Sequence, residues 1–180
     1  VTDDNDLVEV DLAATPTVVE GVVDGITYTA TLTGGTAGND ITVTLDNGEI
    51  ITILAGQPSG EVKIDALTDD IYIDASTIDN AIDTVVETNA GQPGALENLK
   101  AAADTSVATN VTDDKDPVTV DLAATPSVVE GTLNSITYTA TLTGGTANNN
   151  ITVTLDNGEV ITIVAGQTSG EVKIDAPFDD

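Results

Sequence analysis

Carboxylates are the side chains through which this sequence is best equipped to do chemistry. The 180 residues contain 31 Asp and Glu against four Lys and Arg, and His, Cys, Met and Trp do not occur. A Ser–His–Asp or Cys–His nucleophile therefore cannot be built. Paired carboxylates can hydrolyse glycosides, yet three Tyr and one Phe offer little aromatic surface for a sugar. We expect no enzyme, and we expect the acids to bind Ca²⁺ through oxygen.

The net charge of −27 excludes several classes of partner. Nucleic-acid binding requires a basic surface that displaces counterions from phosphates, and an anionic membrane surface would repel the chain. No apolar run approaches the roughly 20 residues that a membrane-spanning helix needs. We therefore expect neither nucleic-acid binding nor direct membrane contact.

An internal repeat determines the expected domain organisation. Residues 1–70 match residues 111–180 at a constant offset of 110, with 55 identities in 70 positions. Similarity of this extent indicates duplication of a complete folding unit, and about 110 residues is a typical domain size. We expect a first repeat at 1–110 and a truncated second repeat at 111–180, in which the counterpart of 71–110 is missing.

Hydrophobic alternation predicts strands throughout the repeat. Residues 26–33 (ITYTATLT) alternate apolar and Thr side chains, as a half-buried strand does. The Asn47-Gly48 pair is a tight-hairpin signal between two such runs. Residues 95–103 have helical composition, enough for a single turn. The seven predicted strands lie at 8–13, 26–33, 40–46, 49–54, 61–65, 71–87 and about 104–111.

Seven short strands separated by turns are typical of an immunoglobulin-like β-sandwich. We therefore expect an all-β fold of two such domains in tandem, the second limited to the first five strands, A to E. A small barrel or jelly roll is the alternative fold.

Several short motifs, taken in order, resemble a known family. The sequence is similar to the extender repeats of giant RTX adhesins, which Gram-negative bacteria export by type I secretion for biofilm formation or ice binding. The resemblance covers the whole 110-residue repeat, although residues 73–96 are longer and more irregular than the family pattern. The family's glycine-rich Ca²⁺ nonapeptides do not occur here. The matching motifs lie at 18–21, 26–32, 41–48, 55–56, 60–62, 69–72, 97–99 and 111–114.

The resemblance implies Ig-like domains joined end to end, with Ca²⁺ at or near the linkers. It also implies an extracellular location, at the cell surface of a Gram-negative bacterium. We expect a structural spacer of a large adhesin whose partners are the neighbouring repeats. The alternatives are a glycan- or protein-binding Ig-like module and a subunit of a surface layer or extracellular filament. The incomplete second repeat further predicts strand pairing with another copy.

Topology indicates which acids bind the metal. With seven strands the two termini lie at opposite ends of a sandwich, so the loops after the first, third and fifth strands share the end where the chain departs. Acids distant in sequence then converge there and supply the oxygens that Ca²⁺ requires. The competing interpretation is that these acids solubilise the protein and form turns. The candidate ligands, counting both repeats, are Glu20, Asp65, Asp69, Asp70, Asp113, Asp114, Asp116, Glu130, Asp3, Asp4, Asp6, Asp175, Asp179 and Asp180.

Overall fold

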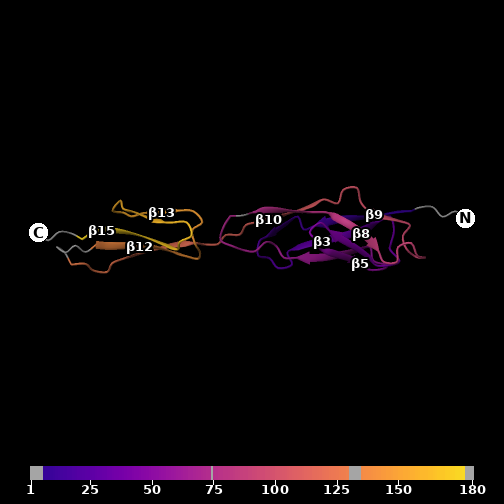
Figure 1. Ribbon diagram of the computed structural model, residues 1–180, viewed down its shortest axis with the longest axis horizontal. Coiled ribbons are helices and arrows are strands. Elements are labelled where there is room, and N and C mark those ends of the chain that lie inside the picture. The colour runs from indigo at the N-terminus through magenta and orange to yellow at the C-terminus, as the bar shows by residue number, and fades with distance from the viewer. Residues whose placement is uncertain (1–5, 74, 130–134, 177–180) are drawn as a thin grey trace. The chain divides into compact units, whose positions relative to one another are not determined.

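The computed structural model describes residues 6–73, 75–129 and 135–176, which contain fifteen β-strands and no helix. The predicted all-β fold is therefore confirmed. Within the described ranges, no helix has the length and apolar character needed to cross a lipid bilayer. The chain forms two compact units (Figure 1). Unit 1 comprises Val1–Asp69 and Ile73–Asp114, and unit 2 comprises Asp70–Tyr72 and Lys115–Asp180. The repeat limits of 1–110 and 111–180 stay a prediction as domain limits.

Unit 1 is built from ten strands. They are β1 (Leu7–Ala14), β2 (Thr17–Val19), β3 (Ile26–Thr33), β4 (Ile41–Leu45), β5 (Ile50–Ile53), β6 (Ser59–Ile64), β7 (Ser76–Asn80), β8 (Ile82–Glu87), β9 (Asn98–Ala101) and β10 (Val107–Thr112). One sheet has the order β6-β3-β1-β9, a second has the order β5-β4-β8, and a third has the order β2-β10-β7.

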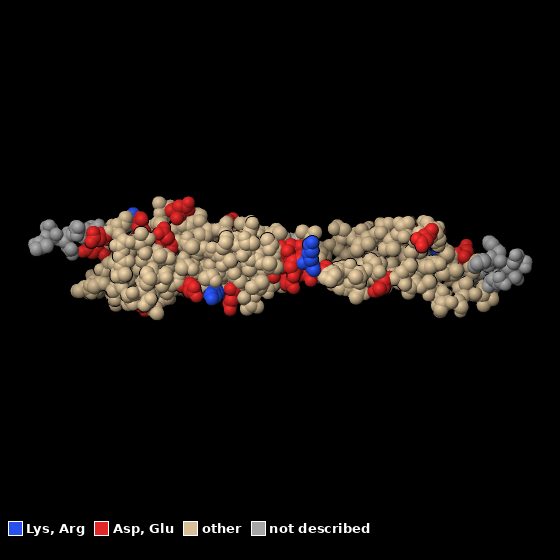
Figure 2. Space-filling view, turned by 180° about the vertical axis from the view of Figure 1, so that it is seen from behind, with Lys and Arg blue, Asp and Glu red and all other residues tan. Residues whose placement is uncertain are grey.

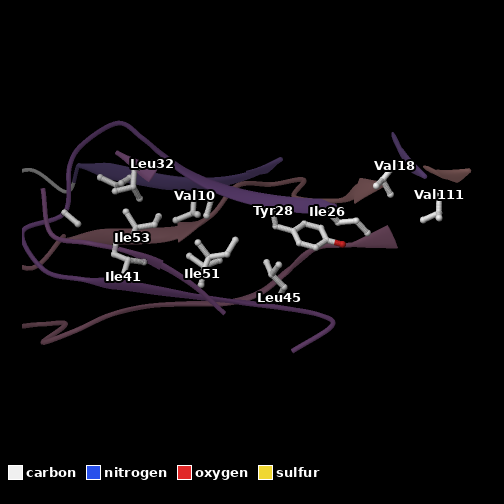
Figure 3. Close-up of a cluster of buried hydrophobic side chains, with 14 residues drawn as sticks. Val10, Val18, Ile26, Tyr28, Leu32, Ile41, Leu45, Ile51, Ile53 and Val111 are labelled. Atoms are coloured by element: carbon white, nitrogen blue, oxygen red, sulfur yellow. The ribbon is translucent and has the colours of Figure 1, made fainter. Parts of the chain in front are cut away.

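The core of unit 1 lies between the layers of a β-sandwich. Figure 3 shows Val10 and Tyr28 on one layer facing Ile51 and Ile53 on the other, all four fully buried. The alternation of β3 explains this arrangement, because Ile26, Tyr28, Ala30 and Leu32 are buried while the Thr residues between them are less so. Branched aliphatic side chains suit such a pleated surface. The sandwich therefore follows from the alternation that the sequence displays.

Three local predictions for unit 1 were wrong. Residues 71–87 do not form one strand, because β7 and β8 belong to different sheets and are separated at Ala81. Residues 95–103 do not form a helical turn but contain β9, which pairs in parallel with β1. The short strand β2, which pairs in parallel with β10, was not predicted. Each error concerns pairing between segments that are distant in sequence, which local composition does not encode.

Unit 2 repeats the first half of unit 1 strand for strand. Its strands are β11 (Thr119–Ala124), β12 (Ser135–Thr143), β13 (Ile151–Thr154), β14 (Val160–Ile163) and β15 (Ser169–Asp175). The registers are also repeated at the offset of 110: Glu9 pairs with Thr33 as Thr119 pairs with Thr143. The sheets have the orders β11-β12-β15 and β13-β14. The segment Asp70–Tyr72 belongs to this unit, and the Tyr72 hydroxyl donates a 3.2 Å hydrogen bond to the Thr146 carbonyl.

Candidate metal centre

Two parallel strands bring Glu20 and Asp114 together at one end of unit 1. Strand β2 lies beside β10 with Val19 opposite Thr112, so the residues that follow the two strands also lie side by side. The Glu20 N–H donates to the Thr112 carbonyl at 3.1 Å, and the Asp114 N–H donates to Glu20 Oε1 at 3.4 Å. The pairing therefore fixes the Glu20 carboxylate against the chain where it leaves unit 1.

A turn at Gly21 adds a third carboxylate. The Gly21 N–H donates a 2.7 Å hydrogen bond to the Leu67 carbonyl, which fixes the loop after β6 against the turn after β2. Gly21 has a φ of 73°, and a Cβ at this position would lie 2.6 Å from the Cβ of Asp69. Glycine is needed here because a side chain would be strained by the backbone and would collide with Asp69. The absence of that side chain lets Asp69 approach Glu20.

The three carboxylates form a compact group of oxygens. One carboxylate oxygen each from Glu20, Asp69 and Asp114 lies within 4.8 Å of the other two. Glu20 is only 4% exposed, whereas Asp69 and Asp114 are exposed. Two like charges about 4 Å apart repel by about 1 kcal/mol in bulk water and by about 4 kcal/mol in the lower dielectric near a protein surface. A bound cation would convert this repulsion into attraction.

The spacing of these oxygens fits a calcium ion. Ca²⁺ binds oxygens at about 2.3–2.6 Å, so two ligands of one ion lie no more than about 5 Å apart. The three carboxylate oxygens meet that condition. Three carboxylates supply fewer than the roughly 6–8 ligands that Ca²⁺ prefers, and backbone carbonyls and water commonly supply the remainder. Glu20, Asp69 and Asp114 would then be the residues that hold the ion.

Other acids predicted for the same site have different surroundings. Asp65 accepts a 2.9 Å hydrogen bond from the Asp24 N–H. Asp113 is half-buried after β10 and is not part of the three-carboxylate group. Asp70 and Asp116 belong to unit 2, where Asp70 Oδ1 accepts a 2.7 Å hydrogen bond from the Tyr72 N–H. Their role as metal ligands stays a prediction.

The remaining candidates lie at other places or outside the described residues. Asp6 immediately precedes β1 and lines a hollow with Gly34 and Gly35, at the end of β1 distant from Glu20. Asp175 ends β15, opposite Ser135. The candidates outside the described residues are Asp3, Asp4, Glu130, Asp179 and Asp180.

Sequence reasoning missed the elements that assemble the group. It named Glu20, Asp69 and Asp114 but did not predict β2 or the role of Gly21. The signal was present in Val18-Val19-Glu20-Gly21, where two β-branched residues precede an acid and a glycine. β-branched residues favour an extended strand, and glycine permits the positive φ that ends it.

A second buried carboxylate in unit 1 has a structural role. Glu87, at the end of β8, is 5% exposed; its Oε2 accepts a 2.7 Å hydrogen bond from the Leu96 N–H, and its Oε1 accepts one from Asn39 Nδ2. These bonds hold the loop between β8 and β9, which borders an open hollow of about 730 Å³. No aromatic side chain lines that hollow, so it lacks the stacking platform that sugar-binding sites commonly use.

The surface of the protein carries the excess of acid that the composition requires. Figure 2 shows acidic side chains distributed over the visible face, with far fewer Lys. The described ion pairs, such as Lys100 with Glu9 at 3.7 Å, are exposed, and exposed pairs contribute little to stability. Most of the negative charge is therefore balanced by solvent ions.

Comparison with solved structures finds distant similarities to two-domain β proteins. A crystal structure of CBD12 from CALX1.2 aligns with a TM-score of 0.41 and 12% identity, over 93% of this chain and 75% of the other. A crystal structure of calcium binding domain CBD12 of CALX1.1 aligns with a TM-score of 0.40 and 11% identity, over 91% of this chain and 74% of the other. Comparison with curated protein sequences finds no match.

One protein family matches nearly the whole chain. The LapA domain matches residues 6–114 and again residues 116–180. LapA is a large biofilm adhesin, and a domain of this kind indicates a role in a cell-surface adhesin. The chain belongs to the LapA domain family.

Proposed function

We propose that this chain is a non-enzymatic spacer segment of a giant RTX-type adhesin, exported by type I secretion to the surface of a Gram-negative bacterium. In this proposal Ca²⁺ binds Glu20, Asp69 and Asp114 and stiffens the chain where it leaves unit 1. The observation that carries the proposal is the convergence of these carboxylates from three separate segments within 4.8 Å.

The mechanical role follows from the segments that the ion would join. Glu20 follows β2, Asp69 lies in the loop after β6, and Asp114 is the last residue of unit 1. An ion shared by the three side chains would restrict the backbone torsions of the departing chain. The near identity of the two repeats supports a spacer, because a rod extends by adding copies of one unit.

The test is a comparison of the 180-residue chain in millimolar Ca²⁺ and in chelator. Extracellular Ca²⁺ sites commonly have dissociation constants of about 10⁻⁴–10⁻³ M. At a free Ca²⁺ concentration of 100 times the dissociation constant, unit 1 should gain about 2.7 kcal/mol of unfolding free energy. Small-angle scattering should show a longer particle with Ca²⁺ than with chelator. Mg²⁺ should replace Ca²⁺ poorly, because it requires tighter octahedral geometry.

Substitutions identify the site. Glu20→Gln, Asp69→Asn and Asp114→Asn should each reduce the Ca²⁺-dependent rise in melting temperature. The matched control is Asp83→Asn, an equal change of charge at an exposed position of β8, which should leave the response to Ca²⁺ unchanged. Equal melting temperatures and equal scattering in Ca²⁺ and in chelator would show that these acids only solvate the protein.

A further inference from the structure

The two sheets of unit 2 have free edges that are paired in unit 1. In unit 1 the second edge of β4 pairs with β8, and the second edge of β1 pairs with β9. In the described part of unit 2, the equivalent strands β13 and β11 pair only with β14 and β12. The third sheet of unit 1, β2-β10-β7, also has no counterpart among the described residues of unit 2.

Apolar side chains of unit 2 are exposed where those neighbours would lie. Val10 is fully buried in unit 1, whereas its counterpart Val120 is 44% exposed. Leu122 is 54% exposed, and Tyr138 is half-buried although Tyr28 is fully buried. Leu122, Tyr138, Val153 and Leu155 line a hollow of about 390 Å³. This open apolar face is the surface considered below.

Unit 1 shows which segment covers such a face. The residues of β8 oppose β4 in a defined register, with Val85 opposite Val43 and Thr84 opposite Thr44. Residues 152–155 of unit 2 have the same sequence as residues 42–45. The free edge of β13 therefore presents the same backbone and the same side chains that β8 recognises in unit 1. Ile78, Ile82, Val85, Leu99 and Val107 supply the apolar side of that cover.

The segment of this chain cannot cover its own unit 2. In unit 1, β10 ends opposite Val19, whereas β1 begins at Leu7. These positions are twelve residues apart along the strand direction, or about 40 Å. Residues 113–118 connect β10 to β11, and such a connection spans at most about 25 Å. A segment that completes unit 2 must therefore come from another polypeptide or follow residue 180.

We propose that the open apolar face of unit 2 binds, in trans, a segment with the sequence of residues 76–112, supplied by another chain of the same repeat type. The segment adds strands to β13 and β11 by backbone hydrogen bonding and covers Val120, Leu122 and Tyr138. The described residues of unit 2 and the incoming segment are both acidic. Salt should therefore strengthen this association by screening repulsion.

The probe is a synthetic peptide of residues 75–114, added to the 180-residue chain at constant Ca²⁺. We expect one peptide per chain and at least tenfold slower hydrogen exchange of amides in β11 and β13. Amides of unit 1 should not change, because unit 1 retains its own segment. A peptide that carries Val85→Asp and Leu99→Asp should not bind.

A second protein keeps the test decisive if the peptide associates with itself. The chain is extended at its C-terminus by a copy of residues 71–114, which should protect β11 and β13 and abolish binding of added peptide. Failure of the extension to protect these strands would overturn the proposal. A dimer of the original chain that buries the same face, and that excess peptide does not dissociate, would also overturn it. Exchange of peptide into unit 1 alone would have the same consequence.

Discussion

Unit 1 and unit 2 have the same strand registers but bury their side chains to different extents. Ile51 and its counterpart Ile161 are both fully buried, whereas Val10 is buried and Val120 is not. The hairpin registers depend on residues within each copy of about 70 residues, and these copies are nearly identical. Closure of the sandwich depends on residues 76–112, which lie outside the duplicated part. Local sequence is therefore sufficient for strand pairing, and distant sequence is required for a complete core.

The part of the core that unit 2 retains lies at one end of its strands. Ala140, Leu142, Ala147 and Ile163 remain buried there, as do their counterparts in unit 1. This end is formed by the strands β12, β14 and β15 and by their connecting loops. The comparison therefore predicts that matched substitutions have equal effects at this end and unequal effects near Tyr138.

The largest difference between the units is expected for truncation of the matched tyrosines. Tyr28→Ala should lower the unfolding free energy of unit 1 by about 3–5 kcal/mol, because truncation of a buried aromatic side chain leaves a cavity. Tyr138→Ala should cost unit 2 much less, since Tyr138 is already half-buried. Native-state hydrogen exchange measures the opening free energy of each unit separately.

A matched pair of leucines provides the control for this prediction. Leu32 and Leu142 are 8% and 6% exposed, so Leu32→Ala and Leu142→Ala should have similar costs. Equal costs for the two tyrosine substitutions would contradict the comparison, because they would mean that Tyr138 is as well packed in solution as Tyr28.

A smaller and equal effect is expected at a glycine that both units share. A Cβ on Gly60 would lie 2.3 Å from the Thr52 carbonyl oxygen, and a Cβ on Gly170 would lie 2.3 Å from the equivalent oxygen of Thr162. Gly60→Ala and Gly170→Ala should therefore each destabilise their own unit by about 1–3 kcal/mol through overpacking. Thermal melts of the single and double variants check this. Tolerance of Gly170→Ala alone would show that β14 and β15 approach less closely than their counterparts.

The buried hydroxyl of Tyr28 provides a third comparison. This hydroxyl has no hydrogen-bond partner among the described residues, and a buried unsatisfied polar group costs about 1–3 kcal/mol. Tyr28→Phe should therefore stabilise unit 1, by about 1 kcal/mol. Tyr138→Phe should change unit 2 by less, because the half-buried side chain is partly hydrated. A loss of stability in the Tyr28→Phe variant would reveal a hydrogen bond to that hydroxyl in solution.

Much of the fold could be predicted from the sequence because half-buried strands reveal themselves by alternation. Strand β3 was predicted with its observed limits, and the hairpin from β4 to β5 was predicted from Asn47-Gly48. The division between β7 and β8 could not be predicted. It depends on Asn80, whose Oδ1 accepts hydrogen bonds from the N–H groups of Ala81 and Asn47. One of those partners is 33 residues away, and no local pattern identifies it.

The candidate metal centre was predictable only as a set of acids. Glu20, Asp69 and Asp114 were among fourteen candidates that share one residue type and similar turn contexts. Their selection requires the parallel pairing of β2 with β10 and the close approach at Gly21. Parallel pairing between residues more than 90 positions apart leaves no periodic signal in either segment. The chemistry of the site was therefore readable from composition, whereas its ligand set required the fold.

The smallest expected effect concerns Asp104, in the loop between β9 and β10. Its carboxylate accepts a 3.0 Å hydrogen bond from the Ser106 N–H, and this backbone bond lowers the pKa of Asp104 below its usual value of 3.8. A lowered pKa in the folded state means that the ionised form stabilises folding. The contribution is fully present above about pH 4 and is lost as the pH falls through the lowered pKa.

Asp104→Asn tests whether this contribution belongs to unit 1. The variant should slightly destabilise unit 1 at neutral pH, leave unit 2 unchanged, and approach wild-type stability as the pH falls below 3.8, the usual pKa of the carboxyl group. Carboxyl-carbon chemical shifts followed by NMR against pH measure the titration directly. Asp83→Asn is again the control, because it makes the same change of charge at an exposed position of unit 1. Titration of Asp104 at 3.8 or above would mean that the loop before β10 does not hold the Ser106 amide against this carboxylate. The segment that closes unit 1 would then be more loosely ordered at its start than the comparison with unit 2 requires.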